Sequence, residues 1–118
     1  MARSLAFVAV LICTSSLLAG EPNEVVFKAK ADGTEQRYVE ILPPGFDATQ
    51  THHLMIALHG HGSDRWQFIR DNRGECKGAR DVATRQGMIF VSPDYRAKTS
   101  WMGPKAEADM VQMIGELR

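Results

Sequence analysis

The sequence predicts an α/β fold in which an antiparallel hairpin leads into a parallel strand–helix–strand unit. Two short runs, Leu54–Leu58 and Met88–Val91, contain only apolar residues, as do strands that are buried on both faces of a parallel sheet. A segment with helical character, Ala79–Gln86, lies between them and ends at Gly87. This order predicts a βαβ unit with a right-handed crossover.

The hairpin is predicted from the segment that precedes this unit. Val25–Lys30 and Arg37–Leu42 have the apolar content and alternation of strands, and Asp32-Gly33 between them is a tight-turn sequence. Pro43-Pro44 ends the second strand, because proline donates no ladder hydrogen bond and keeps the preceding residue extended.

The last predicted element is a helix that begins at Pro104, a residue favoured in the first helical turn. Met110, Met113, Ile114 and Leu117 recur at helical spacing and give it one apolar face, which we interpret as core packing. Because such a face covers a sheet, we expect a further strand beyond this helix. The sequence is therefore predicted to be the front part of a longer domain.

The first twenty residues have the layout of a secretory signal peptide. Arg3 supplies one positive charge, and the mostly apolar run Leu5–Leu18 follows it. That run of 14 residues is shorter than the roughly 20 that a membrane-spanning helix needs, so a removable leader is favoured over an anchor or a buried helix. We expect cleavage between Ala19 and Glu21, and a secreted or periplasmic product that is no longer attached to a membrane.

Residues 21–118 would then form one partial α/β domain. Its net charge would be near −1, because the whole chain has 14 basic and 14 acidic residues and Arg3 is removed with the leader. This balance gives no footprint for nucleic acid or an anionic membrane. Cys13 would leave with the leader. Cys76 is then a free loop thiol or the partner of a cysteine elsewhere, and nothing near it has metal-ligand spacing.

The segment His59-Gly60-His61-Gly62-Ser63-Asp64 carries the clearest functional pattern, because it directly follows a predicted buried strand. Open α/β sheets bind ligands at the carboxyl ends of their strands, and glycines there let backbone N–H groups face the cleft. Two such N–H groups could hold a developing oxyanion. Loss of one such donor typically costs roughly 3 kcal/mol of transition-state stabilisation.

The order "RYVEILPPGFD", "LMIALHGHGSDRWQF", "GMIFVSPDYR" and "SWMGPKAEADM" resembles the N-terminal half of a secreted α/β-hydrolase. It is similar to the esterase D, feruloyl esterase and polyhydroxyalkanoate depolymerase-like group, which overlaps with prolyl-oligopeptidase-type hydrolases. The resemblance implies that His59-Gly60 begins the oxyanion loop, that the backbone N–H of His61 is the donor beside Gly62, and that the His59 ring braces the loop. It also implies serine-type hydrolysis of a carboxylic ester, with no cofactor and no metal.

The sequence departs from that family where the nucleophile is concerned. A serine in Gly-x-Ser-x-Gly, then an acid and a histidine are required in this order, and neither Ser63, Ser92 nor Ser100 has these glycines around it. The chain by itself is therefore predicted to be inactive. A small core and a sheet that is open at one edge also predict poor solubility or partial folding.

Other residues near the strand ends have two interpretations each. Arg96 and Trp101 could line the acyl pocket, although packing and ion pairing around a loop is the favoured alternative for both. Asp64 is expected to cap a helical turn that begins at Arg65.

Two alternative functions remain open. His59 and His61 could bind a metal, but the metallo-β-lactamase-type motif His-x-His-x-Asp-His needs Asp and His where Ser63 and Asp64 stand. The other alternative is an exported α/β binding module or an inactive remnant without catalysis. On the hydrolase interpretation the substrate is a small-molecule or polysaccharide-linked ester, and no residue selects one ester.

Overall fold

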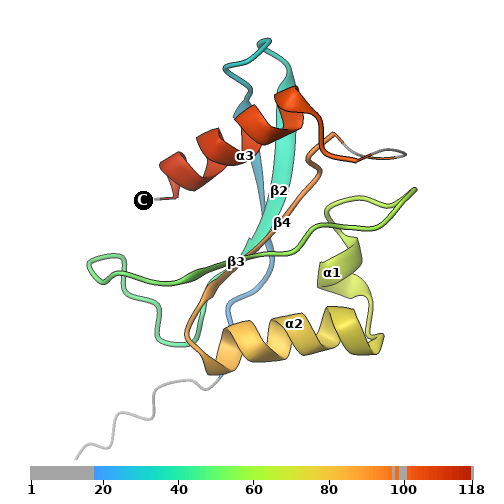
Figure 1. Cartoon of the computed structure of the whole chain (residues 1–118). Coiled ribbons are helices and arrows are strands. Elements are labelled where there is room, and N and C mark those ends of the chain that lie inside the picture. The colour runs from blue at the N-terminus through green and yellow to red at the C-terminus, as the bar shows by residue number, and fades with distance from the viewer. Residues whose placement is uncertain (1–17, 97, 99–100, 118) are drawn as a thin grey trace, which may run out of the picture.

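The computed structural model describes residues 18–96, 98 and 101–117, so the predicted signal peptide lies almost wholly outside the described part. Within this described part, four strands form one mixed sheet in the order β1-β2-β4-β3, with three helices packed around it (Figure 1). The elements, in chain order, are β1 (Asn23–Lys28), β2 (Glu35–Ile41), β3 (Leu54–Ile56), α1 (Gln67–Arg70), α2 (Gly74–Arg85), β4 (Ile89–Pro93) and α3 (Pro104–Glu116). No helix in the described ranges is long and apolar enough to span a membrane.

The pairing confirms both predicted units. β1 and β2 form the antiparallel hairpin, β2 pairs antiparallel with β4, and β3 pairs parallel with β4 across the crossover that contains α2. The first strand begins and ends two residues earlier than predicted. The chain leaves β1 because Ala29 and Gly33 close the turn, with Gly33 N–H donating to Ala29 O at 2.7 Å and Gly33 at φ +74°.

The prediction for the crossover helix was wrong at its N-terminus. α2 begins at Gly74, five residues before Ala79, and Gly74 and Gly78 account for the difference because glycine lowers helix propensity. Cys76 consequently lies in the first turn of a helix and is only 1% exposed, so it is not a loop thiol. Burial raises the pKa of its thiol, which lowers its reactivity.

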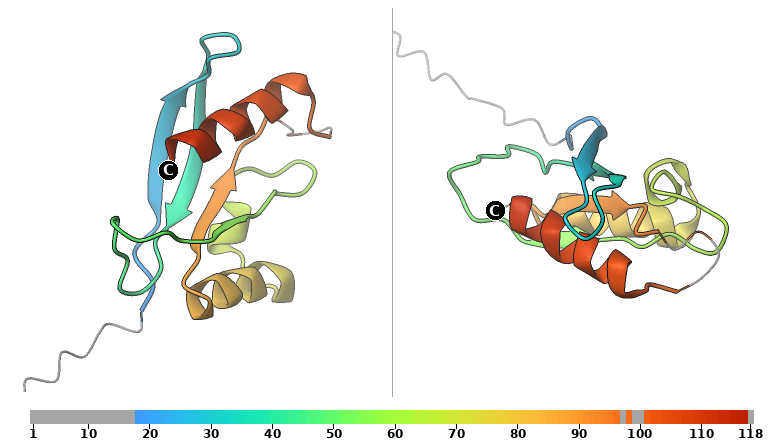
Figure 2. Two further views of the ribbon diagram at one scale, coloured as in Figure 1. Left: turned by 60° about the vertical axis from the view of Figure 1, so that its left-hand side comes forward. Right: turned by 90° about the horizontal axis from the view of Figure 1, so that it is seen from above.

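Helices cover both faces of the sheet (Figure 2). On one face, α3 contributes Met110 and Met113 to a core that includes Tyr38 and Val91. On the other face, α1 and α2 cover a second core that includes Val39, Ile69, Ala83 and Phe90. Successive residues of β2 and of β4 thus point into different cores, as the period-two geometry of strands requires.

Tyr38 gives the fold a predicted sensitivity to alkali. Tyr38 is 5% exposed, and the centroid of its ring lies 6.0 Å from that of Phe27. Burial, with smaller contributions from Glu40 and Glu116, raises the pKa of Tyr38 to about 12. An unfolded tyrosine ionises near pH 10, so the unfolded state loses its proton first and stability falls as the pH rises from about 10 to 12.

Tyr38→Phe keeps the packing and removes this proton, so we expect a shallower loss of stability above pH 10. Urea unfolding at a series of pH values up to about 11.5 measures the slope. Equal slopes for both proteins would show that Tyr38 does not titrate in this way. Some loss should persist in the variant, because burial also raises the pKa of Tyr95.

Candidate functional site

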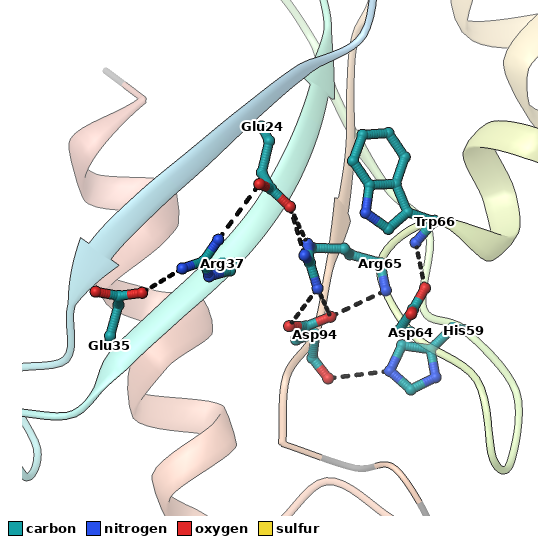
Figure 3. Close-up of polar contacts among 8 residues, drawn as sticks. All are labelled: Glu24, Glu35, Arg37, His59, Asp64, Arg65, Trp66 and Asp94. Atoms are coloured by element: carbon teal, nitrogen blue, oxygen red, sulfur yellow. Dashed lines mark hydrogen bonds and ion pairs between the residues drawn. The ribbon is translucent and has the colours of Figure 1, made fainter.

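The HGHGSD segment starts where β3 and β4 end, and the ring of His59 joins the two strand ends. His59 is 3% exposed, with Nε2 3.0 Å from Asp94 O and Nδ1 2.9 Å from Gly60 O (Figure 3). Its own carbonyl accepts a hydrogen bond from the Tyr95 hydroxyl at 2.5 Å. A neutral imidazole donates from one nitrogen only, so the tautomer decides which of the two carbonyls is bonded.

Three backbone N–H groups of this loop have different surroundings. Gly60 N–H donates to Gln67 Oε1 at 2.6 Å, and Gly62 N–H donates to Lys98 O at 2.5 Å. His61 N–H has no hydrogen-bond partner within the described part of the chain, and His61 is exposed. The sequence suggested two available donors, whereas the loop holds one between two occupied neighbours.

An ion-pair network ties the far end of the loop to the sheet (Figure 3). Arg65 N–H donates to Asp94 Oδ1 at 3.0 Å, Arg65 Nη1 lies 3.1 Å from Asp94 Oδ2, and Arg65 Nε donates to Glu24 Oε1 at 2.6 Å. Hydrogen bonding from Arg65, with Arg37 also nearby, lowers the pKa of the Glu24 carboxyl. Arg65 therefore connects β1, the loop and the residue that follows β4.

Asp64 caps the chain where it enters α1. Its Oδ1 accepts a hydrogen bond from Trp66 N–H at 2.8 Å, which confirms a capping contact, although the helix begins at Gln67 and not at Arg65. The backbone carbonyl of Asp64 also accepts the N–H of Gln67 at 3.1 Å, and Gln67 is the first residue of α1 and the one whose side chain holds Gly60.

The two other predicted site residues lie differently. Arg96 donates from Nε to Asp109 Oδ2 at 2.5 Å and from Nη1 to Asp32 Oδ2 at 2.6 Å, so its guanidinium is committed to two carboxylates. Trp101 is 95% exposed. The ion-pairing alternative is the one that the contacts of Arg96 support.

A hollow of about 370 Å³ lies beside the loop, and its lining is largely polar. The lining includes His59, Ser63, Asp64, Asp94 and Arg96. Its position at the ends of β3 and β4 is where an α/β sheet binds ligands. Trp101 is not among its lining residues.

The metal alternative finds little support in this geometry. Both ring nitrogens of His59 face carbonyl oxygens, and no group of three or more potential ligands gathers within the described ranges. His59 and His61 therefore do not form a ligand set with the acidic residues around them.

Sequence reasoning missed the residues that hold the loop from outside it. Gln67 carries no pattern that links it to Gly60. Asp109 did carry one, because it lies in register with Ala106 and Met113 on the buried face of α3. An acid on that face needs a buried partner, and Arg96 is that partner.

Several solved structures share this fold over less than half of their length. A CE1 ferulic acid esterase from the anaerobic fungus Anaeromyces mucronatus matches 86% of this chain and 43% of its own, at 19% identity and a TM-score of 0.60. FphF, a fluorophosphonate-binding serine hydrolase of Staphylococcus aureus, matches 84% and 42%, at 17% identity and a TM-score of 0.56. An S-formylglutathione hydrolase from the same bacterium matches 80% and 41%, at 18% identity and a TM-score of 0.50.

Comparison with protein-family models and with curated protein sequences gives no match. The structural likeness therefore shows the fold alone: this chain has a mixed-sheet α/β architecture that is similar to part of these esterase and hydrolase structures.

Proposed function

We propose that this chain is the N-terminal part of an exported serine hydrolase that acts on carboxylic esters. The observation that carries the proposal is the His61 N–H group, which lies at the ends of two parallel strands and lacks a protein partner in the described ranges. Both neighbouring donors, at Gly60 and Gly62, are already used to hold the loop. The loop is thus built to present one donor.

The role of the chain in the reaction is to stabilise negative charge. A serine outside residues 1–118 attacks the ester carbonyl while a histidine oriented by an acid takes the serine proton. The ester C–O bond then breaks, the histidine gives that proton to the departing alcohol, and water hydrolyses the resulting acyl-enzyme to release the acid and the free serine. His61 N–H donates to the developing oxyanion, together with the N–H of the residue that follows the nucleophile. No cofactor or metal enters these steps.

The leader at residues 1–20 directs export, and the substrate is a small-molecule or polysaccharide-linked ester. The likeness to a ferulic acid esterase supports an aromatic acyl group as the first to be tested. The absence of Gly-x-Ser-x-Gly from the sequence supports inactivity of this chain by itself.

A fluorophosphonate probe tests the proposal because it labels activated serines covalently. We expect no labelling of the 118-residue chain, and labelling of one serine in a translation product that continues beyond codon 118. The longer product should also hydrolyse p-nitrophenyl acetate or methyl ferulate.

Labelling of Ser63, Ser92 or Ser100 would contradict the proposal that residues 1–118 supply the oxyanion donor while the nucleophile lies outside them. A longer product without a reactive serine and without esterase activity would overturn the function itself. The exported binding module or inactive remnant would then be the better interpretation.

A further inference from the structure

Two consecutive residues after β4 have the left-handed backbone conformation, which is sterically unfavourable for residues other than glycine. Tyr95 has φ 37° and Arg96 has φ 59°, and they are the only non-glycine residues with positive φ in the described ranges. Such strain persists only where surrounding contacts hold it, and it is often found next to functional sites.

The guanidinium of Arg96 supplies the contacts that hold this turn. Its Nε and Nη2 donate to Asp109 at 2.5 and 3.1 Å, and Nη1 and Nη2 donate to Asp32 at 2.6 and 3.1 Å. Asp109 on α3 is 1% exposed, so its buried carboxylate needs the two hydrogen bonds from the Arg96 guanidinium to offset the loss of hydration. Asp32 lies in the β1–β2 turn, and hydrogen bonding from Arg96 holds the pKa of its carboxyl well below the usual range.

The strained turn and the residue Lys98 beyond it hydrogen-bond to the oxyanion loop on both sides of His61. Before it, the Tyr95 hydroxyl donates to His59 O, and the two rings are in contact at a tilt of 40° with their centroids 4.6 Å apart. After it, the carbonyl of Lys98, two residues beyond Arg96, accepts the Gly62 N–H. Tyr95 and Lys98, which lie close to Arg96 in the sequence, therefore contact the residues on either side of the His61 amide.

We propose that Arg96 and Asp109, with Asp32, are positioning residues for the His61 oxyanion donor. The buried ion pair holds the left-handed turn, and the turn holds His59 and Gly62 in place. This inference rests on the proposed function for its catalytic meaning. The mechanical part, which is that the ion pair orders the loop, stands on the contacts alone.

Amide hydrogen exchange, resolved by NMR, tests the mechanical part in the longest soluble form of the protein that contains residues 21–118. Arg96→Ala should speed exchange of the Gly62 amide at least about tenfold and move the His61 amide resonance. Arg96→Lys keeps the charge without the fork and should give an intermediate effect. Asp109→Asn, a near-isosteric change, should act in the same direction.

Lys105→Ala is the matched control, since Lys105 contacts the same Asp32 carboxylate at 3.3 Å but has an exposed side chain, and solvent weakens such a pair. It should leave the loop amides unchanged. The proposal is overturned if the Gly62 amide exchanges normally in Arg96→Ala, or if the amides of Val39 and Val91 accelerate equally, which would mean general destabilisation. If Arg96→Ala does not fold, exchange of the Gly62 amide, relative to the amides of Val39 and Val91, is compared in Arg96→Lys and Asp109→Asn, and the same two results overturn the proposal.

Kinetics separate this inference from the proposed function. In an active longer product, Arg96→Lys should lower kcat with little change in KM, because the oxyanion exists only in the transition state. An unchanged kcat would overturn the catalytic part of the inference. A product that lacks esterase activity but shows the loop effect would overturn the proposed function and leave the positioning contacts intact.

Discussion

Replacing Met113 with alanine is expected to unfold a large fraction of the chain at about 25 °C. Met113 has no exposed surface and lies in the core between α3 and the sheet, together with Tyr38 and Val91. Truncation of a buried methionine to alanine costs about 2–5 kcal/mol through lost burial and the cavity that is left. Whole domains have only about 5–15 kcal/mol of stability, and small ones lie at the lower end.

Val111→Ala is the matched control, because Val111 is on the same helix and 67% exposed. Its free energy of unfolding should change by no more than about 0.5 kcal/mol. Urea unfolding, followed by far-UV circular dichroism, measures both variants. Equal stability of the two would mean that α3 does not pack on the sheet as described.

The parts of the fold that local pattern determines were predictable. The antiparallel hairpin follows from alternation around Asp32-Gly33, and the parallel unit follows from two wholly apolar runs separated by a helix. The ends of the elements were less predictable, because single hydrogen bonds decide them. Gly33 N–H to Ala29 O ended β1 early, and two glycines concealed the first turn of α2.

In the candidate site, too, the features that depend on local sequence were predictable and the long-range contacts were not. The loop from His59 to Asp64 was identifiable in the sequence, because glycines that directly follow a buried strand are typical of a ligand-binding loop. The residues that hold the loop are distant in sequence, since Arg96 meets Asp32 across 64 positions and His59 meets Tyr95 across 36. No pattern of local spacing contains such pairs, and only the buried register of Asp109 indicated one of them.

The two edges of the sheet differ in how they resist pairing with another chain. β1 carries Glu24 and Lys28, and charged residues protect an edge strand. β3 is the last strand at the other edge in the described part of the chain, and it contains only Leu, Met and Ile. Leu58, two residues beyond β3, is 42% exposed, so this edge is apolar and unprotected.

We therefore expect the 118-residue chain to self-associate through the β3 edge, and Leu58→Lys to shift it strongly towards monomer. A charge at this position would have to be buried between the paired edges, which is costly without a partner. Sedimentation velocity over a roughly hundredfold range of concentration measures the shift, and we expect the association midpoint to rise by about tenfold or more, which corresponds to roughly 1.4 kcal/mol.

Val26→Lys, on β1, provides the comparison that locates the association. Val26 is 47% exposed, so the two substitutions add the same charge at nearly equal exposure on opposite edges of one sheet. If the chain associates through the β3 edge, only Leu58→Lys should increase the fraction of monomer. Equal release by both variants would mean that net charge, and not an unpaired strand, controls the association, because each variant changes the net charge by the same amount.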